Sequence, residues 1–487
     1  MRGWVRAVAV AVAGLVGGPS VVRRALAVTF VWLVPELAWA ALPYPPELRP
    51  QVEFWKKIFA HYKQTEVVVH DSLVPERIYS VLDFSADAAE LQSDVLPTYV
   101  QIRVDQEKER IRSLLVRLHQ NGGQPSAWSQ EERRLAWLFR SDRSEDKFLL
   151  AADPKRIRAQ RGLREKFAEG IRISGRYLPT MEAIFRAEGL PIELTRLPLV
   201  ESCFNVRAYS KAGAAGIWQF MPETGRRFMR VDDLVDERRD PVESTKAAAK
   251  FLKQNYAKLG TWPLAVTAYN HGPAGMQRAV EAVGTRDFVE ILRRYQGPGF
   301  GFASRNFYAE LLAAIEIERE AERYYGPIER LRPFDLEAVE LRGSVPFSVL
   351  ARLAGVDGET LAEWNPSLTP RVTEGRAPAP QGFRLRLPRA NRATFETRYA
   401  AWRKEREGQV QLARRQGSRK SRSQREPVAA VAQSSAKAKR THRVKRGQTL
   451  TAIARMYGLS VAEIERENRL RRGARLRAGQ VLIIPEG

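Results

Sequence analysis

The sequence predicts a mostly α-helical (α+β) protein of several domains, and three observations support this fold class. Apolar residues recur at helical spacing through the first two thirds of the chain. Near the C-terminus, two segments repeat the same order of strand, helix, helix and strand. The 487 residues leave room for about two to four domains, and 44% of them are hydrophobic, which is enough for a sizeable core.

The first 40 residues have the pattern of an export signal. Arg23 and Arg24 precede an apolar run at 25–34, and the tripeptide at 38–40 has the small-x-small form of a cleavage site. We therefore expect cleavage after Ala40 and a location in the periplasm or cell envelope. A retained membrane anchor is the alternative, although the run is short for a membrane span. No lipidation cysteine follows it.

Residues 41–165 are expected to form an N-terminal helical region. Five apolar residues recur there at helical spacing, and we interpret them as core in preference to a sugar platform: Phe54, Trp55, Ile58, Phe59 and Tyr62. Short strands are predicted at 67–69 and 78–82. A charged helix is predicted at 105–118, where one side is apolar through Ile111, Leu114, Leu115 and Leu118.

Residues 166–328 contain most of the chemically informative residues. A helix is predicted at 245–259, and another at 191–202 that Pro198 should kink. Glu201 falls at the C-terminal end of the second helix, among apolar residues. Burial and the negative end of the helix dipole both raise a carboxyl pKa, so this side chain is suited to general acid catalysis near neutral pH. A surface glutamate at a helix end is the alternative.

Glycines and the lone cysteine near Glu201 also carry information. Gly213, Gly216 and Gly225 indicate a backbone that passes close to another chain segment or to a ligand. Cys203 is the only cysteine in the sequence, so an intramolecular disulfide and a cysteine-based metal cluster are both excluded. No base signature accompanies it, and we interpret it as a small core residue.

Four motifs, taken together, resemble those of the family 23 lytic transglycosylases, which are relatives of goose-type lysozyme, and above all their membrane-bound murein transglycosylase D group. They are Leu197–Phe204 with the Glu201-Ser202 pair, Gly213–Pro222, Ala268–Gly272 and Asn306–Tyr308. The resemblance covers roughly residues 45–390 and 441–485. It implies a lysozyme-like helical catalytic domain at 166–328 that cleaves peptidoglycan.

The resemblance implies a reaction that needs a single protein carboxylate. Glu201 would protonate the oxygen that links N-acetylmuramic acid to N-acetylglucosamine, and then take the proton of the muramic acid's own C6 hydroxyl. A 1,6-anhydro ring closes, water is not consumed, and neither a metal nor a cofactor is required. An ordinary glycosidase would need a second carboxylate. The aspartates at 232, 233, 236 and 240 look like loop and helix-start residues instead.

The family's saccharide-binding positions are carried over by the same resemblance. They are Ser210, Gly213, Gln219, Tyr269, Asn270 and Tyr308, and the last of these is expected to point toward Glu201. An ordinary buried hydrogen-bonding role is the alternative for each. His271 is interpreted as a supporting residue and not as a metal ligand, because no partner histidine lies at ligand spacing.

The second C-terminal repeat, at 441–487, resembles a LysM module, which implies binding of N-acetylglucosamine-containing glycans. The positions implied are Gly447, Thr449, Leu450 and Asn468. The first repeat, at 331–388, is degenerate: Val345-Pro346-Phe347 stands where a Thr-Leu pair is expected. Either sugar binding or a purely structural role is open for it. A basic linker is predicted at 389–440, with a helical run near 395–412.

The net charge of +24 calls for a polyanionic partner or surface. Residues 403–446 hold fifteen basic against three acidic side chains, so half of the excess lies in one short stretch and not on a folded face. We therefore expect peptidoglycan strands as the partner, with wall or membrane-surface association and no nucleic acid, and a monomeric protein. A hydrolytic muramidase and a non-catalytic wall-binding scaffold remain as alternatives.

Overall fold

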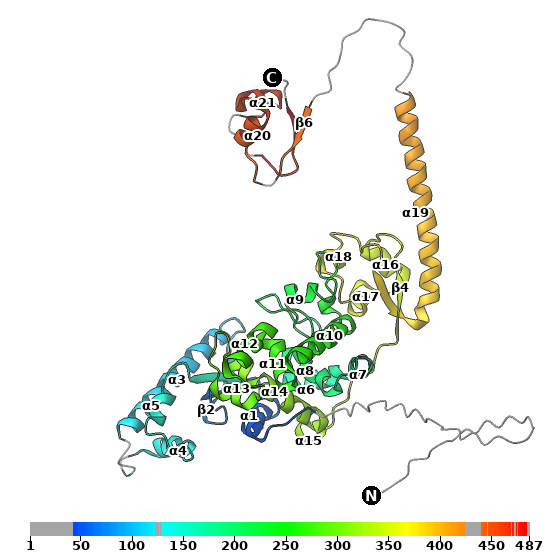
Figure 1. Ribbon diagram of the computed structural model, residues 1–487. Helices are drawn as coiled ribbons and strands as arrows, with labels where there is room; N and C mark the ends of the chain where they lie inside the picture. The colour runs from blue at the N-terminus through cyan, green and yellow to red at the C-terminus, as the bar shows by residue number, and fades with distance from the viewer. Residues whose placement is uncertain are drawn as a thin grey trace, which may run out of the picture. The chain divides into compact units, whose positions relative to one another are not determined.

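The fold is described from a computed structural model of the chain (Figure 1). It describes residues 42–121, 126, 128–423, 440–445, 447–468, 470, 471, 474 and 476–484. The predicted export signal lies outside these ranges. Among the described helices, none is both long enough and apolar enough to cross a membrane. The chain divides into two compact units at Ala401 and Trp402. The helical prediction for the fold class is confirmed.

The first long helix shares one core with the helices of residues 164–325. The turn η1 (Pro46–Leu48) leads into α1 (Arg49–Ala60). Four residues of the predicted stripe are buried on this helix, and the fifth, Tyr62, lies past its end and is partly buried against the same core. The indole nitrogen of Trp55 donates to Asn306 Oδ1 over 3.1 Å. Helix α1 therefore contributes to the core around the motifs, although the sequence assigns it to a separate N-terminal region.

A small antiparallel sheet follows, in the order β2-β1-β3. Strands β1 (Glu66–Asp71) and β2 (Ile78–Asp83) confirm the two predicted strands, whereas β3 (Ile157–Arg161) was not predicted because its IRAQR sequence is mostly polar. The helices between β2 and β3 are α2 (Ser85–Glu90), α3 (Leu96–Gln120), α4 (Gln130–Leu138) and α5 (Lys147–Ala151). Helix α3 contains the predicted charged helix, with the predicted apolar side buried.

The next part of the chain is helical and surrounds α11, most of which is buried. Figure 1 shows these helices as the green group, and their bounds are as follows. They are α6 (Arg164–Ser174), α7 (Leu178–Ala187), η3 (Ile192–Arg196), α8 (Leu197–Ser202), α9 (Pro222–Arg226), η4 (Glu237–Arg239), α10 (Pro241–Leu259), α11 (Trp262–His271), α12 (Pro273–Val283), α13 (Phe288–Arg294), α14 (Phe302–Arg319) and α15 (Ala321–Tyr325). Helix α10 starts four residues before the predicted helix, because Asp240 caps it and Pro241 suits its first turn.

Both C-terminal repeats have the predicted order of strand, helix, helix and strand. The first contains β4 (Leu336–Glu340), α16 (Phe347–Ala354), α17 (Gly358–Trp364), the extra turn α18 (Pro370–Thr373) and β5 (Arg384–Pro388). The second contains β6 (Arg440–Arg443), α20 (Leu450–Tyr457), α21 (Val461–Glu467) and β7 (Val481–Ile484). Between them, α19 (Arg389–Ser423) is longer at both ends than the predicted helical run.

An asparagine at the equivalent position stabilises each of the two repeats. Asn365 accepts a hydrogen bond from Arg386 N, and its amide donates to the carbonyls of Arg386 and Leu361. In the second repeat, Asn468 accepts from Ile483 N and donates to the Ile483 and Ile464 carbonyls. Each side chain thus joins the end of a helix to the last strand of its repeat.

Candidate active site

Glu201 lies near the end of the short helix α8. The predicted kinked helix at 191–202 is present as the 3-10 turn η3 followed by α8, with Pro198 in the first turn of α8. The helix stops after Ser202 because Cys203 and Phe204 adopt left-handed conformations, with φ of 49° and 55°. Glu201 is therefore the last residue but one of α8, at the negative end of the helix.

Two neighbouring segments hold this helix end. Gly170 of α6 comes so close that a Cβ there would lie 2.8 Å from the carbonyl oxygen of Cys203, so the position requires glycine. The Ser202 hydroxyl donates to the Ile217 carbonyl over 2.9 Å. The serine of the Glu-Ser pair therefore links α8 to the loop that contains Gln219.

The electrostatic environment of Glu201 favours a protonated carboxyl. The side chain is partly buried, and within the described residues no hydrogen bond holds its carboxyl group. Burial raises the pKa of Glu201 to about 8, in the direction that its apolar sequence neighbours predict. At neutral pH most of the molecules therefore carry a transferable proton at this position.

The segment 210–221, called the Gln219 loop below, lies beside the end of α8. Gln219 has a φ of 47°, and its side-chain nitrogen donates to the Gly216 carbonyl over 2.8 Å. Ser210 Oγ accepts from Ala214 N and shapes the loop locally. The predicted close approach is present at Gly216. Gly213 has a positive φ of 92°, but a Cβ there would meet nothing closer than 3.8 Å.

Tyr269 and Asn270, near the end of α11, take different positions. The Tyr269 hydroxyl donates to the Trp218 carbonyl over 2.8 Å, next to Gln219. Burial raises the pKa of Tyr269 well above its ordinary value, and the charge of Glu201 adds to this shift, so the two side chains lie near each other. Asn270 is exposed and accepts a hydrogen bond from the Ser304 hydroxyl.

Tyr308 does not point in the direction that the resemblance implies. It is fully buried, its hydroxyl donates to the Pro43 carbonyl over 2.6 Å, and its ring packs edge-on against Phe288. The neighbouring Phe307 instead lies parallel to the ring of Tyr269, at 6.5 Å between centroids. Consecutive residues of a helix point about 100° apart, so the two side chains cannot both face Tyr269. The aromatic residue of this motif that faces Tyr269 is Phe307.

A second acidic side chain near Glu201 was missed by the sequence analysis. Glu310 follows Phe307 by one turn of α14, and the pKa of its carboxyl is raised to about 8 by burial and by the charge of Glu201. Arg158 of β3 partly offsets this shift, and its guanidinium lies 4.2 Å from the centroid of the Phe302 ring. Helical spacing from motif residues was the available signal for Glu310. Nothing local marked Arg158, which only the sheet brings to this place.

His271 and the acidic residues form no metal centre in the described part of the chain, where no group of three or more candidate ligands is found. The His271 ring packs against Phe300 and lies near the Ser304 hydroxyl. Burial lowers the pKa of His271, which keeps the ring neutral at physiological pH.

The four positions implied for LysM glycan binding have structural roles in the module. Gly447 has a φ of 83°, and Thr449 caps α20 by accepting from Ala452 N. Leu450 is buried in the core of the module. Both amide atoms of Asn468 are used by the backbone, as described above. Their predicted contacts with glycan stay a prediction.

Comparison with known families places recognised domains on these structural parts. Residues 181–292, which include Glu201, Gln219 and Tyr269, match the Transglycosylase SLT domain. Residues 335–404 match the LysM-like domain of lytic transglycosylase MltD, and are called the LysM-like domain below. Residues 442–485 match the LysM domain.

Similar proteins carry related names. Membrane-bound lytic murein transglycosylase D of Escherichia coli K12 is 28% identical over 312 residues, which are 62% of each chain, so the match spans less than two thirds of that relative. A putative tributyltin chloride resistance protein of an Alteromonas species is 38% identical over 19% of this chain and 46% of its own. A solved inactive mutant of lytic transglycosylase Slt from Pseudomonas aeruginosa is 18% identical, over 48% of this chain and 40% of its own; its TM-score of 0.25 is too low to compare the folds. The chain therefore contains an SLT domain, an MltD-type LysM-like domain and a LysM domain, in this order, and it is similar to lytic murein transglycosylase D over 62% of its length.

Proposed function

We propose that this protein is a peptidoglycan lytic transglycosylase in which Glu201 is the catalytic acid and base. The observation that carries the proposal is the partly buried carboxyl of Glu201, with a pKa of about 8, beside Tyr269 and within the SLT match. A carboxyl that keeps its proton at neutral pH can give it to a leaving oxygen.

The proposed reaction moves one proton through Glu201 and uses no water. The carboxyl gives its proton to the oxygen between N-acetylmuramic acid and N-acetylglucosamine, and that bond breaks. The resulting carboxylate removes the proton of the C6 hydroxyl, whose oxygen bonds to C1 and closes the 1,6-anhydro ring. Glu201 ends protonated and ready for another cycle. The substrate supplies the nucleophile, so one carboxylate serves both steps.

The binding part of the proposal rests on groups around the helix end. The amides of Gln219 and Asn270 offer donors and acceptors that suit sugar hydroxyls and N-acetyl groups, and Ser210 and Gly213 belong to the same loop as Gln219. The LysM domain would retain the enzyme on glycan strands. The proposal includes peptidoglycan as the partner, a location in the periplasm or at the cell envelope, and a monomeric protein.

Product analysis tests this proposal directly. Wild-type protein acting on purified glycan strands should release fragments with 1,6-anhydromuramic ends, lighter by one water than hydrolysis products, and digestion in H₂¹⁸O should leave these ends unlabelled. Glu201→Gln keeps the shape of the side chain but lacks the proton. It should lose at least about 10²-fold in rate while glycan binding remains. Full activity of Glu201→Gln would remove the site assignment.

A hydrolytic muramidase is the second candidate, and Glu310 is the observation that favours it. A hydrolase pairs its acid with a second carboxylate that activates water, and Glu310 lies within electrostatic reach of Glu201. Its own raised pKa keeps it protonated at neutral pH, where it cannot accept a proton from water. Glu310→Gln should therefore leave the anhydro product as the main product. Hydrolysis would be favoured by two results together: a fall of about 10²-fold or more in the rate of Glu310→Gln, and ¹⁸O-labelled reducing ends in the wild-type products.

A further inference from the structure

The LysM-like domain pairs with the loop that leads into α10. Residues 234–236 lie antiparallel to 367–369 through a bridge between Val235 and Leu368, both of which are buried. Asp236 N donates to a carbonyl of the LysM-like domain over 2.7 Å. Buried main-chain pairing of this kind orders both segments, because breaking it would leave polar groups unpaired away from water.

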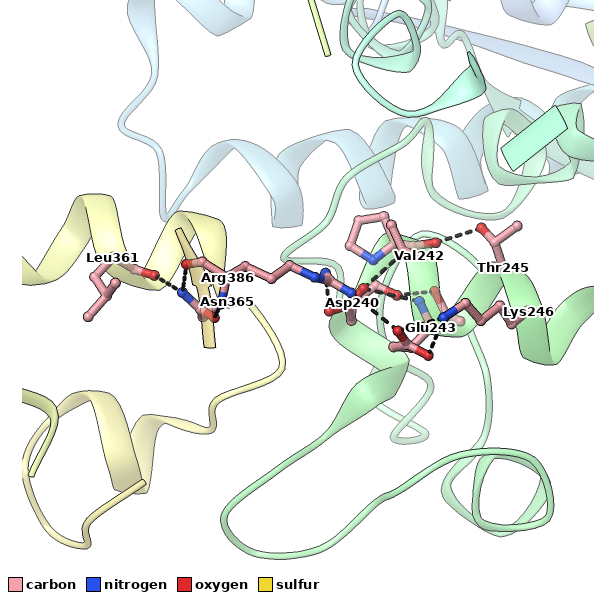
Figure 2. A network of polar contacts seen from close by, with 10 residues as sticks. Asp240, Val242, Glu243, Thr245, Lys246, Leu361, Asn365 and Arg386 are labelled. Carbon is pink, nitrogen blue, oxygen red and sulfur yellow. Dashed lines mark hydrogen bonds and ion pairs between the residues drawn. The ribbon is translucent and has the colours of Figure 1, made fainter. Parts of the chain in front are cut away.

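A charged contact reinforces this pairing at the start of α10. Figure 2 shows Arg386 of β5 reaching Asp240 and Glu243, with Asn365 holding the backbone of Arg386 from the other side. The Arg386 guanidinium is 3.3 Å from the Glu243 carboxylate and also pairs with Asp240. Asp240 is itself the residue that caps α10. The pairs are mostly shielded from solvent, which makes them stronger than exposed ones.

Arg238 connects the same loop to the Gln219 loop. Its side chain is 3% exposed and forms a two-pronged pair with Asp236. The remaining nitrogen donates to the carbonyls of Gly213, over 2.7 Å, and Phe220, over 2.9 Å. These two carbonyls belong to the Gln219 loop on either side of Gln219. A planar guanidinium can make all of these bonds together, whereas an ammonium group cannot reproduce the fork.

The backbone of Arg238 also sets the shape of the Gln219 loop. A Cβ at Gly216 would lie 1.9 Å from the Arg238 carbonyl oxygen, so the two segments are in direct contact. Gln219 takes a left-handed conformation that a side-chain-bearing residue rarely adopts, with its amide on Gly216. Such a conformation persists only where the surroundings impose it.

We propose that the LysM-like domain is a fixed part of the catalytic centre, and that it positions the Gln219 loop through Asp236 and Arg238. This rests on the proposed function, because Gln219 matters only if the loop contacts glycan. Arg238 is a positioning residue in this scheme, and Arg386 anchors the domain that supports it. The first repeat thus has a role that does not require it to bind sugar.

The test compares full-length Arg386→Gln with Arg376→Gln. Arg376 forms one exposed pair with Glu374 inside the LysM-like domain and, among the described residues, has no hydrogen bond or ion pair with the loop at 232–243, so it controls for the loss of an arginine charge elsewhere in the same domain. Arg386→Gln should raise the KM for short soluble glycan strands about three- to tenfold, while the pH limb of Glu201 stays in place. Hydrogen exchange at 213–220 should accelerate, and the buried amides of α11 should be unchanged.

Arg238→Lys supplies the second arm of the test, because it keeps the charge but not the fork. It should show the same rise in KM and the same faster exchange at 213–220. The proposal is wrong if Arg386→Gln matches Arg376→Gln in both KM and exchange. An inactive wild type would contradict the proposed function instead, and the exchange at 213–220 would still decide whether the LysM-like domain holds the loop.

Discussion

At the scale of single residues, Glu201 is unfavourable to folding at neutral pH. Its pKa is about 8 in the folded chain against an ordinary 4.5, so the folded state keeps a proton that the unfolded state loses. The free energy of unfolding therefore falls as pH rises from 4.5 to 8, since the folded state binds more protons over this window. The cost of keeping a reactive carboxyl out of water appears as lost stability.

Glu201→Gln should for this reason stabilise the protein above pH 4.5. The partly exposed position reduces the effect, and we expect about 1–3 kcal/mol at pH 8, shrinking toward zero near pH 4.5. Thermal unfolding of both proteins across pH 4 to 8 measures the difference. A stability difference that does not change with pH would show that the carboxyl is not perturbed.

The same pKa predicts the pH dependence of the reaction. The acid form of Glu201 is needed to protonate the leaving oxygen, so kcat/KM on soluble glycan should decline above about pH 8. A decline already centred near pH 4.5 in the wild type would contradict the assignment of Glu201 as the acid.

At the scale of elements, the asparagine of each repeat joins a helix end to the final strand. Asn468→Ala leaves the backbone of Ile483 without its partners, which should cost the LysM domain about 1–3 kcal/mol. Hydrogen exchange of β7 in the full chain should accelerate, with Arg455→Gln, a substitution on the exposed face of α20, as the control. Reduced glycan binding without faster exchange would instead point to a direct contact between Asn468 and sugar.

At the scale of the whole molecule, binding and cleavage are expected to separate. The LysM domain follows α19 and a basic stretch, and contributes to retention without taking part in the transition state. Deleting residues 441–487 should weaken retention on insoluble peptidoglycan and leave turnover of short soluble glycans nearly unchanged. Sedimentation with sacculi and a soluble-strand assay measure the two properties. Loss of soluble turnover would mean that the module contributes to the active site.

Much of the fold could be predicted because it depends on local patterns. Short segments carry the helical spacing that predicted α1, α3 and α10. They also carry the repeated pattern that predicted the two C-terminal repeats, β4 to β5 and β6 to β7. Strand β3 could not be predicted in the same way, since its polar sequence becomes a strand only by pairing with β1. The direction of Tyr308 also depended on packing. Phe307 and Tyr308 are adjacent aromatic residues, and the sequence does not show which of the two faces the site.

The sequence by itself determined the fold class, the domain order and a glutamate at the end of a short helix, since residue type and spacing encode these directly. Only the tertiary structure placed Glu310 of α14 near that glutamate, and Arg158 of β3 near Glu310. It also joined the LysM-like domain to the Gln219 loop through Arg386, Asp236 and Arg238. Such contacts depend on which surfaces meet after the chain folds, and no local pattern records the partner of a charged side chain.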